Sequence, residues 1–216
     1  MKTDLYTKGT KGNKLPQVVH LHIPRTAGTG LKAHLKEHVH RYVSGHSWWE
    51  TPVPGGPLCF IVLREPTERV SSLYNFIRDP QRSHRHREWL GRVTLKELMQ
   101  DPAARTIQFS NGQVRQICGT AAENQEITAA HLEQAWTNLT APEVIAVPLD
   151  YIDAGLAELG RRLGQAIPPL TRILNAAPRQ LLDHETTRAI RCLNAWDMLL
   201  YARLLAHAQE AYPVDQ

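Results

Sequence analysis

Short apolar runs alternate along this chain with longer stretches in which apolar side chains recur every three or four positions. The apolar runs lie at residues 17–23, 58–63 and 144–147. Runs of this length, rich in Val, Ile and Leu, are typical of strands that are buried on both faces of a parallel sheet. The sequence therefore predicts three parallel strands at the centre of the fold.

The periodic stretches predict helices that lie between and after these strands. Leu31, Leu35 and Val39 have helical spacing behind the first strand, and Pro66 suits the first turn of a helix behind the second. Further helices are expected to open at the capping box of residues 94–97 and to occupy residues 128–139, 150–163 and, as one long C-terminal helix, 186–210. The segments predicted to be irregular are residues 43–57, 78–92 and 109–119.

The alternation of strands and helices predicts an α/β fold in which a central parallel sheet carries helices on both faces, followed by a helical C-terminal part. A length of 216 residues suits one domain. We expect a flexible N-terminal segment at residues 1–16 and a single domain over residues 17–216. Ligands bind such sheets at the carboxyl ends of the strands, where residues 24–30 and Arg64 are expected to lie.

Composition and charge narrow the range of partners. Hydrophobic residues make up 42% of the chain and charged residues 21%, which is ordinary for a soluble globular protein. The formal net charge of +4 fits an anionic ligand, but the sequence carries no nucleic-acid-binding motif, so no nucleic-acid partner is expected. We find no signal-peptide pattern and no apolar run near the roughly 18 residues that span a bilayer. The three widely spaced cysteines fit a reducing compartment, and we expect a cytoplasmic protein.

The segment PRTAGTG, directly after the first predicted strand, has the composition of an anion-binding loop. Gly28 and Gly30 allow the backbone to approach a ligand closely. Thr26 and Thr29 carry hydroxyl donors, and Arg25 adds a positive charge. Backbone N–H groups of such a loop, and those at the start of the following helix, point at the same anion. A plain turn between strand and helix that contains glycine is the alternative interpretation.

This loop differs from the phosphate-binding loop of nucleotide hydrolases. That motif ends in Gly-Lys-[Ser/Thr], with the lysine on the phosphates and the hydroxyl on magnesium. Here the basic residue precedes the small residues, and the third predicted strand runs into Pro148 rather than into a magnesium-binding aspartate. Such a loop suits the transfer of a group of low charge, such as a sulfuryl group, whereas phosphoryl transfer usually needs Mg²⁺. We expect that no metal is required.

A second candidate anion site follows the second strand, in the segment LREPTERVSSLYNF. Arg64 ends a buried strand, where a charge without a partner is costly. Ser72 lies in the second turn of the next helix, on the face that it shares with Arg69 and away from the apolar stripe. Arg64 and Ser72 together can hold a second anion. Arg69 either joins them or forms a structural ion pair with Glu65 or Glu68.

The segment IPRTAGTG followed by VLREPTERVSSLYNF resembles the sulfotransferases that use 3′-phosphoadenosine 5′-phosphosulfate (PAPS), and is closest to the branch of the heparan and uronyl 2-O-sulfotransferases. Weaker matches continue through NGQVRQICG to the C-terminal helical segment. The resemblance implies a P-loop-like three-layer fold, a first loop that binds the 5′-phosphosulfate and a second segment that binds the 3′-phosphate. The residues carried over are Arg25, Thr26, Ala27, Gly28, Thr29 and Gly30 for the first, and Arg64 and Ser72 for the second.

Two positions depart from the pattern of that family. The loop lysine of the family is Arg25 here, which keeps the charge but is planar, longer and never deprotonated. The resemblance implies that Arg25 neutralises the leaving oxygen. Glu65 stands where the family has an aspartate, and we expect its role to be structural.

Sulfuryl transfer to an alcohol needs a base that removes the hydroxyl proton as the new O–S bond forms, and histidine suits this task. The resemblance assigns the base to His46, in the loop between the two anion sites, while a surface histidine without a role is the alternative. Glu50 is a second candidate base. Trp48 and Trp49 either pack in the structure or offer a platform to an acceptor ring.

Two further histidines, His20 and His22, alternate along the first strand and therefore share one face. We expect them to be hydrogen-bonded residues of the core rather than metal ligands or bases.

The combined prediction is an enzyme that transfers a sulfuryl group from PAPS to a hydroxyl-bearing acceptor by in-line displacement. The resemblance implies a carbohydrate acceptor, and the basic segment 78–92 either meets an acidic glycan or is a solvated loop. Two other functions stay open. One is a P-loop kinase acting on a small molecule. The other is a non-catalytic nucleotide- or glycan-binding module, which remains an alternative because Arg25 replaces the family's lysine. The sequence does not indicate the acceptor's identity or the oligomeric state.

Overall fold

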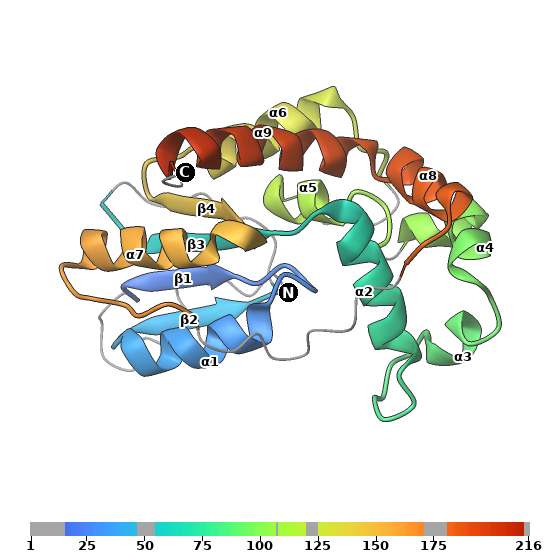
Figure 1. Ribbon diagram of the computed structural model, residues 1–216, viewed down its shortest axis with the longest axis horizontal. Helices are drawn as coiled ribbons and strands as arrows, with labels where there is room; N and C mark the ends of the chain where they lie inside the picture. Colours follow the sequence, from blue (N-terminus) through green and yellow to red (C-terminus); the bar gives the residue numbers. More distant parts are fainter. Residues whose placement is uncertain (1–15, 47–54, 107, 120–124, 171–180, 214–216) are drawn as a thin grey trace.

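The computed structural model describes residues 16–46, 55–106, 108–119, 125–170 and 181–213. Within these ranges the strands form one four-stranded sheet (Figure 1). They are β1 (Val18–Leu21), β2 (Tyr42–Gly45), β3 (Leu58–Leu63) and β4 (Val144–Pro148). Every neighbouring pair is parallel, in the order β2-β1-β3-β4. The predicted parallel α/β sheet is therefore confirmed.

The strand order creates a switch point between β1 and β3. From β1 the chain passes to β2 on one side and then returns to β3 on the other side of β1. Connections that leave in opposite directions open a crevice outside the carboxyl ends of the two strands, which is the usual ligand position in open α/β sheets. Both segments that the sequence singled out as anion sites follow these two strands.

Helices surround the sheet (Figure 1). In the described ranges the α-helices are α1 (Gly28–His38), α2 (Pro66–Arg78), α3 (Arg87–Leu90), α4 (Leu95–Gln100), α5 (Gly112–Ile117), α6 (Ala129–Leu139), α7 (Ile152–Leu163), α8 (His184–Leu193) and α9 (Ala195–Ala211). α1 and α7 cover one face of the sheet, and α5, α6 and α9 cover the other. Alternate residues of β1 serve the two layers, since Val19 packs towards α9 and Val18 towards α1. The prediction of helices on both faces is confirmed.

α2 leads from the sheet into a separate helical part of the molecule (Figure 1). Its apolar stripe packs with α3, α4 and α8 around a third apolar cluster, which includes Leu73, Ile77, Leu98 and Ile190. Only two residues separate the end of β3 from the start of α2, so the first turns of α2 stay beside the edge of the sheet. The helix thus connects the candidate site to this third cluster.

Two segments that were predicted to be irregular contain regular structure. Tyr42–Gly45 forms the edge strand β2 rather than part of a loop, and its half-buried residues gave no continuous apolar run. Gly112–Ile117 forms α5, and all six of its residues are buried, polar ones included, so no amphipathic stripe marked it. Within residues 78–92 the single turn Arg87–Leu90 is helical.

The long C-terminal helix predicted for residues 186–210 is instead two helices, α8 and α9, which meet at Asn194. Asn111 holds this junction: its backbone amide donates to Asn194 Oδ1, and its Oδ1 accepts from the backbone amides of Trp196 and Asp197 at the start of α9. The break between α8 and α9 therefore follows from polar contacts with Asn111, which is far away in the sequence. Even α9, at 17 residues, lacks the length and apolar character of a membrane span, as do the other helices of the described ranges.

Candidate functional site

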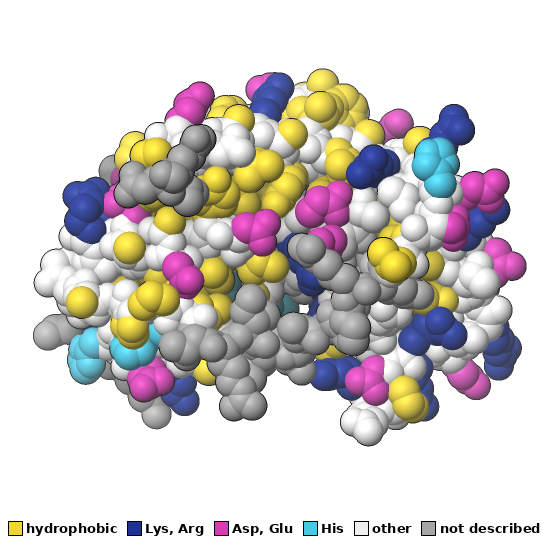
Figure 2. All heavy atoms as spheres, in the orientation of Figure 1, with side chains coloured by type: hydrophobic (Ala, Val, Ile, Leu, Met, Phe, Trp, Pro, Cys, Tyr) yellow, Lys and Arg dark blue, Asp and Glu magenta, His cyan; other side chains and the backbone are white. Residues whose placement is uncertain are grey.

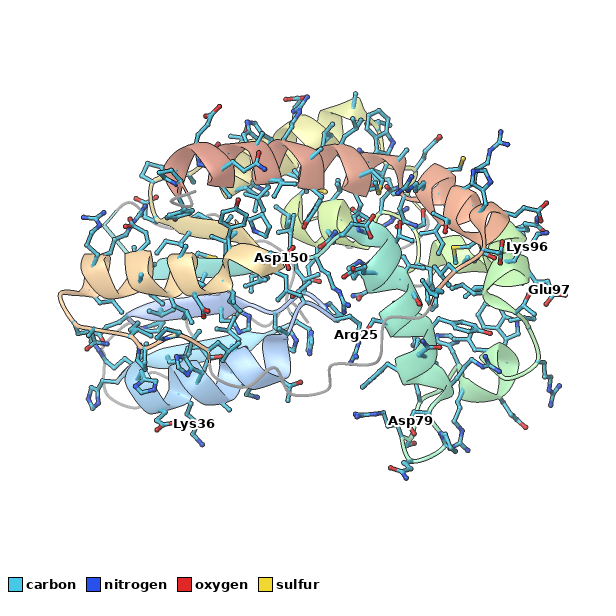
Figure 3. The ribbon with its side chains drawn as sticks, in the orientation of Figure 1. Arg25, Lys36, Asp79, Lys96, Glu97 and Asp150 are labelled. Carbon is cyan, nitrogen blue, oxygen red and sulfur yellow. The ribbon has the colours of Figure 1, made fainter. Side chains whose placement is uncertain are left out.

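The candidate site lies at the carboxyl ends of β1 and β3. Figure 3 shows Arg25 between the tip of β1 and α2, with Asp150 just beyond the end of β4, the strand that pairs with β3. Acidic and basic side chains both lie on the visible face of this region (Figure 2). The structure brings the segments after β1 and β3 to one edge of the sheet, so their side chains can act on the same ligand.

The loop after β1 is shaped by two residues in the left-handed backbone region. Arg25 has a φ of 73° and Ala27 a φ of 63°, a conformation that costs a residue other than glycine about 1–2 kcal/mol. Between them, Thr26 is fully buried and its hydroxyl donates to the carbonyl of Ile23 at 2.9 Å. The hydroxyl of Thr26 therefore fixes the shape of the loop from inside. Strain of this kind is typical of ligand-binding loops.

α1 begins directly after this loop without a side-chain cap. Ala27 is the N-cap residue and offers no capping hydrogen bond. The first N–H groups of any helix have no partner within the helix, and here they include those of Gly28, Thr29 and Gly30. These amides lie at the positive end of the dipole of α1, where an anion is stabilised. Their arrangement fits the predicted anion-binding loop, and we call the loop with the amides of Gly28, Thr29 and Gly30 the cradle.

Gly28 makes a close approach that no other residue can make. A Cβ atom at this position would lie 1.8 Å from Nε2 of His22. The imidazole of His22 therefore lies directly against the start of α1, next to the cradle. Burial first, and then the charges of His46, Lys32 and Arg25, lower the pKa of His22 to about 4. His22 is consequently neutral at physiological pH.

Arg25 links the two segments of the site. Its Nε donates to the hydroxyl of Ser72 at 3.0 Å, and its Cζ lies 4.6 Å from the centre of the Phe76 ring. Ser72 is buried on α2. Burial first, and then the charges of Arg64 and Arg82, lower the pKa of Arg25 to about 10. The guanidinium thus extends from the loop towards α2.

Arg64 is held through its backbone and its side chain. Its N–H donates to Oε1 of Gln113, and its carbonyl accepts from Nε2 of the same glutamine, both at 3.0 Å. The guanidinium pairs with Glu68 at 3.3 Å and reaches the carbonyl of Arg25 at 3.4 Å. Glu65 caps α2 by accepting from the amide of Glu68 at 2.8 Å, so its role is structural, as predicted.

His46 is oriented by a backbone carbonyl. Its Nδ1 lies 2.9 Å from the carbonyl oxygen of His22, and the two imidazole rings are 4.0 Å apart. Because a carbonyl can only accept, Nδ1 carries the proton and Nε2 keeps its lone pair in the neutral ring. Desolvation beside His22 lowers the pKa of His46, while the hydrogen bond to the carbonyl opposes this. A neutral imidazole with a fixed tautomer can act as a base.

His20 completes a row of three histidines. It is fully buried, its ring stacks on that of His22 at 5.4 Å, and its Nδ1 lies 3.0 Å from the hydroxyl of Ser44. Burial, followed by the charges of His22 and His46, lowers the pKa of His20 well below its ordinary value. The prediction of a hydrogen-bonded core histidine is confirmed for His20, whereas His22 is only half-buried and lies beside the cradle.

The sequence suggested Glu65 or Glu68 as an ion-pair partner for Arg69, but in the structure Arg69 pairs with a different residue. It is fully buried, donates to the carbonyl of Gln108 at 2.7 Å and pairs with the equally buried Asp197 at 3.8 Å. The prediction was based on helical spacing, which relates residues of the same helix. Asp197 lies on α9, so this spacing could not identify it. Arg69 therefore belongs to the framework behind the site.

Sequence reasoning missed two residues of this region and the position of a third. Gln113 holds the backbone of Arg64, and Phe76 contacts Arg25 and also Arg82, which was predicted only as part of the basic segment 78–92. Gln113 lies in a segment that was predicted to be irregular. Phe76 lies in a predicted helix, where its position gives no sign of a contact with arginine. The remaining candidates, Trp48, Trp49 and Glu50, lie outside the described residues.

No protein-family model and no curated protein matches this chain. The case for a function therefore rests on the residues of this site and on their arrangement.

Proposed function

We propose that this protein is a sulfotransferase that moves a sulfuryl group from PAPS to a hydroxyl-bearing acceptor, on a P-loop-like fold. One observation carries the proposal. The cradle and the second segment meet, since Arg25 donates to Ser72 at 3.0 Å and the guanidinium of Arg64 reaches the carbonyl of Arg25 at 3.4 Å. PAPS carries anionic groups on both sides of its adenosine, and two adjoining cationic sites suit such a donor.

Each segment has a part in holding the donor. The amides of Gly28, Thr29 and Gly30, at the positive end of α1, bind the 5′-phosphosulfate and stabilise the charge that develops on the leaving oxygen. Arg64 and Ser72 bind the 3′-phosphate and fix the position of the nucleotide along the sheet edge. Glu68 and Gln113 orient Arg64 for this task.

The transfer itself is a single displacement. Nε2 of His46 accepts the hydroxyl proton of the acceptor as the acceptor oxygen bonds to sulfur, and the bond from sulfur to the bridging phosphate oxygen breaks. The products are the sulfated acceptor and 3′-phosphoadenosine 5′-phosphate (PAP). Positioning and electrostatic stabilisation provide the rate enhancement. A carbohydrate hydroxyl is the proposed acceptor, and the basic segment after α2 suits an acidic glycan.

A transfer assay tests the proposal. The protein is incubated with PAPS labelled in its sulfuryl group and a panel of glycans and small hydroxyl compounds, and the labelled product is identified. His46→Ala should abolish most of the transfer while PAP affinity changes less than twofold, since the imidazole acts on the acceptor. His40→Ala is the matched control, because His40 is exposed and lies outside the site. Equal turnover of the two variants would contradict the assignment of the base.

A thermal-shift experiment separates the competing functions. Stabilisation by PAP without magnesium supports a sulfotransferase, whereas stabilisation by ATP with magnesium alone would indicate a kinase. The non-catalytic module deserves its own test because the guanidinium of Arg25 is directed to Ser72 and Phe76. Tight binding of PAP with no transfer from PAPS to any acceptor of the panel would favour that function.

A further inference from the structure

α9 is apolar on two sides. On one side Leu200, Leu204 and Ala208 are buried in the protein. On the other side lies a second row of apolar residues, each exposed or half-buried, which we call the outer stripe: Ala195, Met198, Leu199, Ala202, Leu205 and Ala206. The outer face of a surface helix is normally polar, so an apolar outer face indicates that something packs on it.

The spacing of the outer stripe is that of a contact between two helices. Its first three positions recur seven residues later, which is the repeat by which one helix packs along another. Leu199 is 49% exposed, and among the described residues only Leu181 is a more exposed large hydrophobic side chain. Figure 2 shows hydrophobic side chains gathered over α9 on this face of the molecule. The outer stripe is therefore accessible along about three turns of the helix.

The outer stripe is complementary to itself when two copies of α9 run antiparallel. Ala202 lies near its middle, with apolar residues three and four positions away on either side. A two-fold axis beside Ala202 sets Leu199 against Ala206 of the facing helix, and Met198 against its Leu205. Large side chains thus meet smaller ones, and the alanines at the axis let the helices approach closely. Such an interface uses the same surface of both copies, as in most homodimers.

Charges of both signs lie beside the outer stripe. Arg203 pairs with Glu133 of α6 at 2.8 Å, and Glu210 is exposed seven positions further along the same side of α9. Antiparallel packing brings this side of both helices together, and the mixture of signs allows it without net repulsion. A helix that lies on an anionic lipid surface instead carries mainly Lys and Arg beside its apolar face. The charges therefore favour a second copy of the chain over a membrane.

We propose that this protein forms a two-fold symmetric dimer in which the outer stripes of two α9 helices pack antiparallel. The inference does not depend on the proposed function, because the outer stripe shares no residue with the cradle or with the segment after β3. The contact centres on one helix from each copy, so the buried area is at the lower end for specific interfaces. A dimer with a Kd on the order of micromolar is expected.

Sedimentation velocity of the full chain over a series of concentrations tests the proposal. Leu199→Asp should raise the Kd of the dimer about tenfold or more, because it places a carboxylate in an apolar contact. Leu181→Asp is the matched control, since Leu181 is an exposed leucine outside α9 and the change in charge is identical. It should alter the Kd by less than about twofold. A monomer at every concentration, or equal effects of the two substitutions, would overturn the proposal.

Disulfide cross-linking tests the orientation of the two helices. The exposed Cys192 is first replaced by serine. Ala202→Cys should then cross-link under a copper–phenanthroline oxidant, since the axis brings the two Cα atoms within the roughly 7 Å that a disulfide spans. Glu210→Cys is the control, because eight positions from the axis on each copy separate the two thiols by about 24 Å. Equal cross-linking of both variants would contradict antiparallel packing.

The same variants identify a different occupant of the outer stripe. If the unaltered chain stays monomeric but sediments with vesicles of anionic phospholipid, and Leu199→Asp abolishes this, the stripe meets a lipid surface and the proposal is wrong. If a dimer forms but neither Leu199→Asp nor cross-linking at position 202 affects it, the interface lies elsewhere and the proposal is equally wrong.

Discussion

Gly28 lies where the first turn of α1 meets the imidazole of His22. A Cβ atom at this position would lie 1.8 Å from Nε2 of His22. The imidazole has little room to move, because the ring of His20 stacks on it and the tilted ring of His46 lies 4.0 Å away. Gly28→Ala is therefore expected to lower the free energy of unfolding by about 1–3 kcal/mol, the usual cost of overpacking. Denaturant unfolding followed by circular dichroism measures the change.

A double-mutant cycle tests the cause of this loss. If the clash with His22 is responsible, His22→Ala should remove much of the penalty of Gly28→Ala, with a coupling energy above about 0.5 kcal/mol. Strict additivity of the two substitutions would show that the clash is not the cause. Because either substitution also alters the cradle, the cycle compares only free energies of unfolding and not ligand binding or activity.

The individual side chains show how far the sequence can predict a site. The glycine at position 28 was predicted to allow close approach to a ligand, but in the structure one side of it is occupied by His22. The direction of Arg25 could not be predicted, because its partner Ser72 lies 47 positions away. Residue types after a strand indicate a kind of chemistry, whereas the orientation of each side chain depends on contacts from other elements.

The first turn of α5 is held by a carboxylate from α9. Asp197 accepts from the amides of Gln113 at 3.1 Å and Val114 at 2.8 Å, and it pairs with Arg69 of α2. Burial raises the pKa of Asp197, but the charge of Arg69 and the two amides stabilise its ionised form. Three helices thus meet at one buried carboxylate.

Asp197→Asn is expected to destabilise the protein by about 3–5 kcal/mol, because it leaves the buried charge of Arg69 without its counter-ion. The matched control is Glu88→Gln, which breaks the highly exposed pair between Glu88 and Arg92 and should cost at most about 1 kcal/mol. Equal midpoints of denaturant unfolding for the two variants would contradict the importance assigned to the buried pair.

Among the elements, those with strong local signals were predicted best. β3 has the bounds that the apolar run indicated, and α2 begins at Pro66, as expected. β2 was missed because a half-buried edge strand has no apolar run, and α5 because its polar residues are buried with its apolar ones. The break at Asn194 was missed because it depends on Asn111, far away in the sequence.

At the scale of the whole molecule, the site lies at the junction of three apolar clusters. Two of them sandwich the sheet, and the third lies among α2, α3, α4 and α8. The loop after β1 and Arg64 come from the sheet, and Ser72 from α2, while Gln113 of α5 holds Arg64. The geometry of the site therefore depends on how the sheet and the helical part are joined.

The row formed by His20, His22 and His46 couples the stability of the whole fold to pH. The pKa of each is lowered below 6.5 in the folded protein, chiefly by burial, so the unfolded chain binds more protons as the pH falls. Their contribution to the free energy of unfolding is complete above about pH 6.5. It is lost progressively as the pH falls towards their pKa values in the folded protein, which is about 4 for His22. Glu158 has a pKa of about 2 in the folded protein, so its stabilising contribution is lost only below the ordinary glutamate pKa of 4.5.

We therefore expect the free energy of unfolding to decrease steadily between pH 7 and pH 5, a window in which the histidines dominate over Glu158. His20→Gln should make this decrease shallower, because one buried imidazole no longer has to take up a proton on unfolding. His40→Gln, at an exposed position, should leave the slope unchanged. Denaturant unfolding at half-unit steps of pH measures all three slopes. A flat profile for the unaltered protein, or the same slope in the His20 variant, would show that this row of histidines does not govern its acid sensitivity.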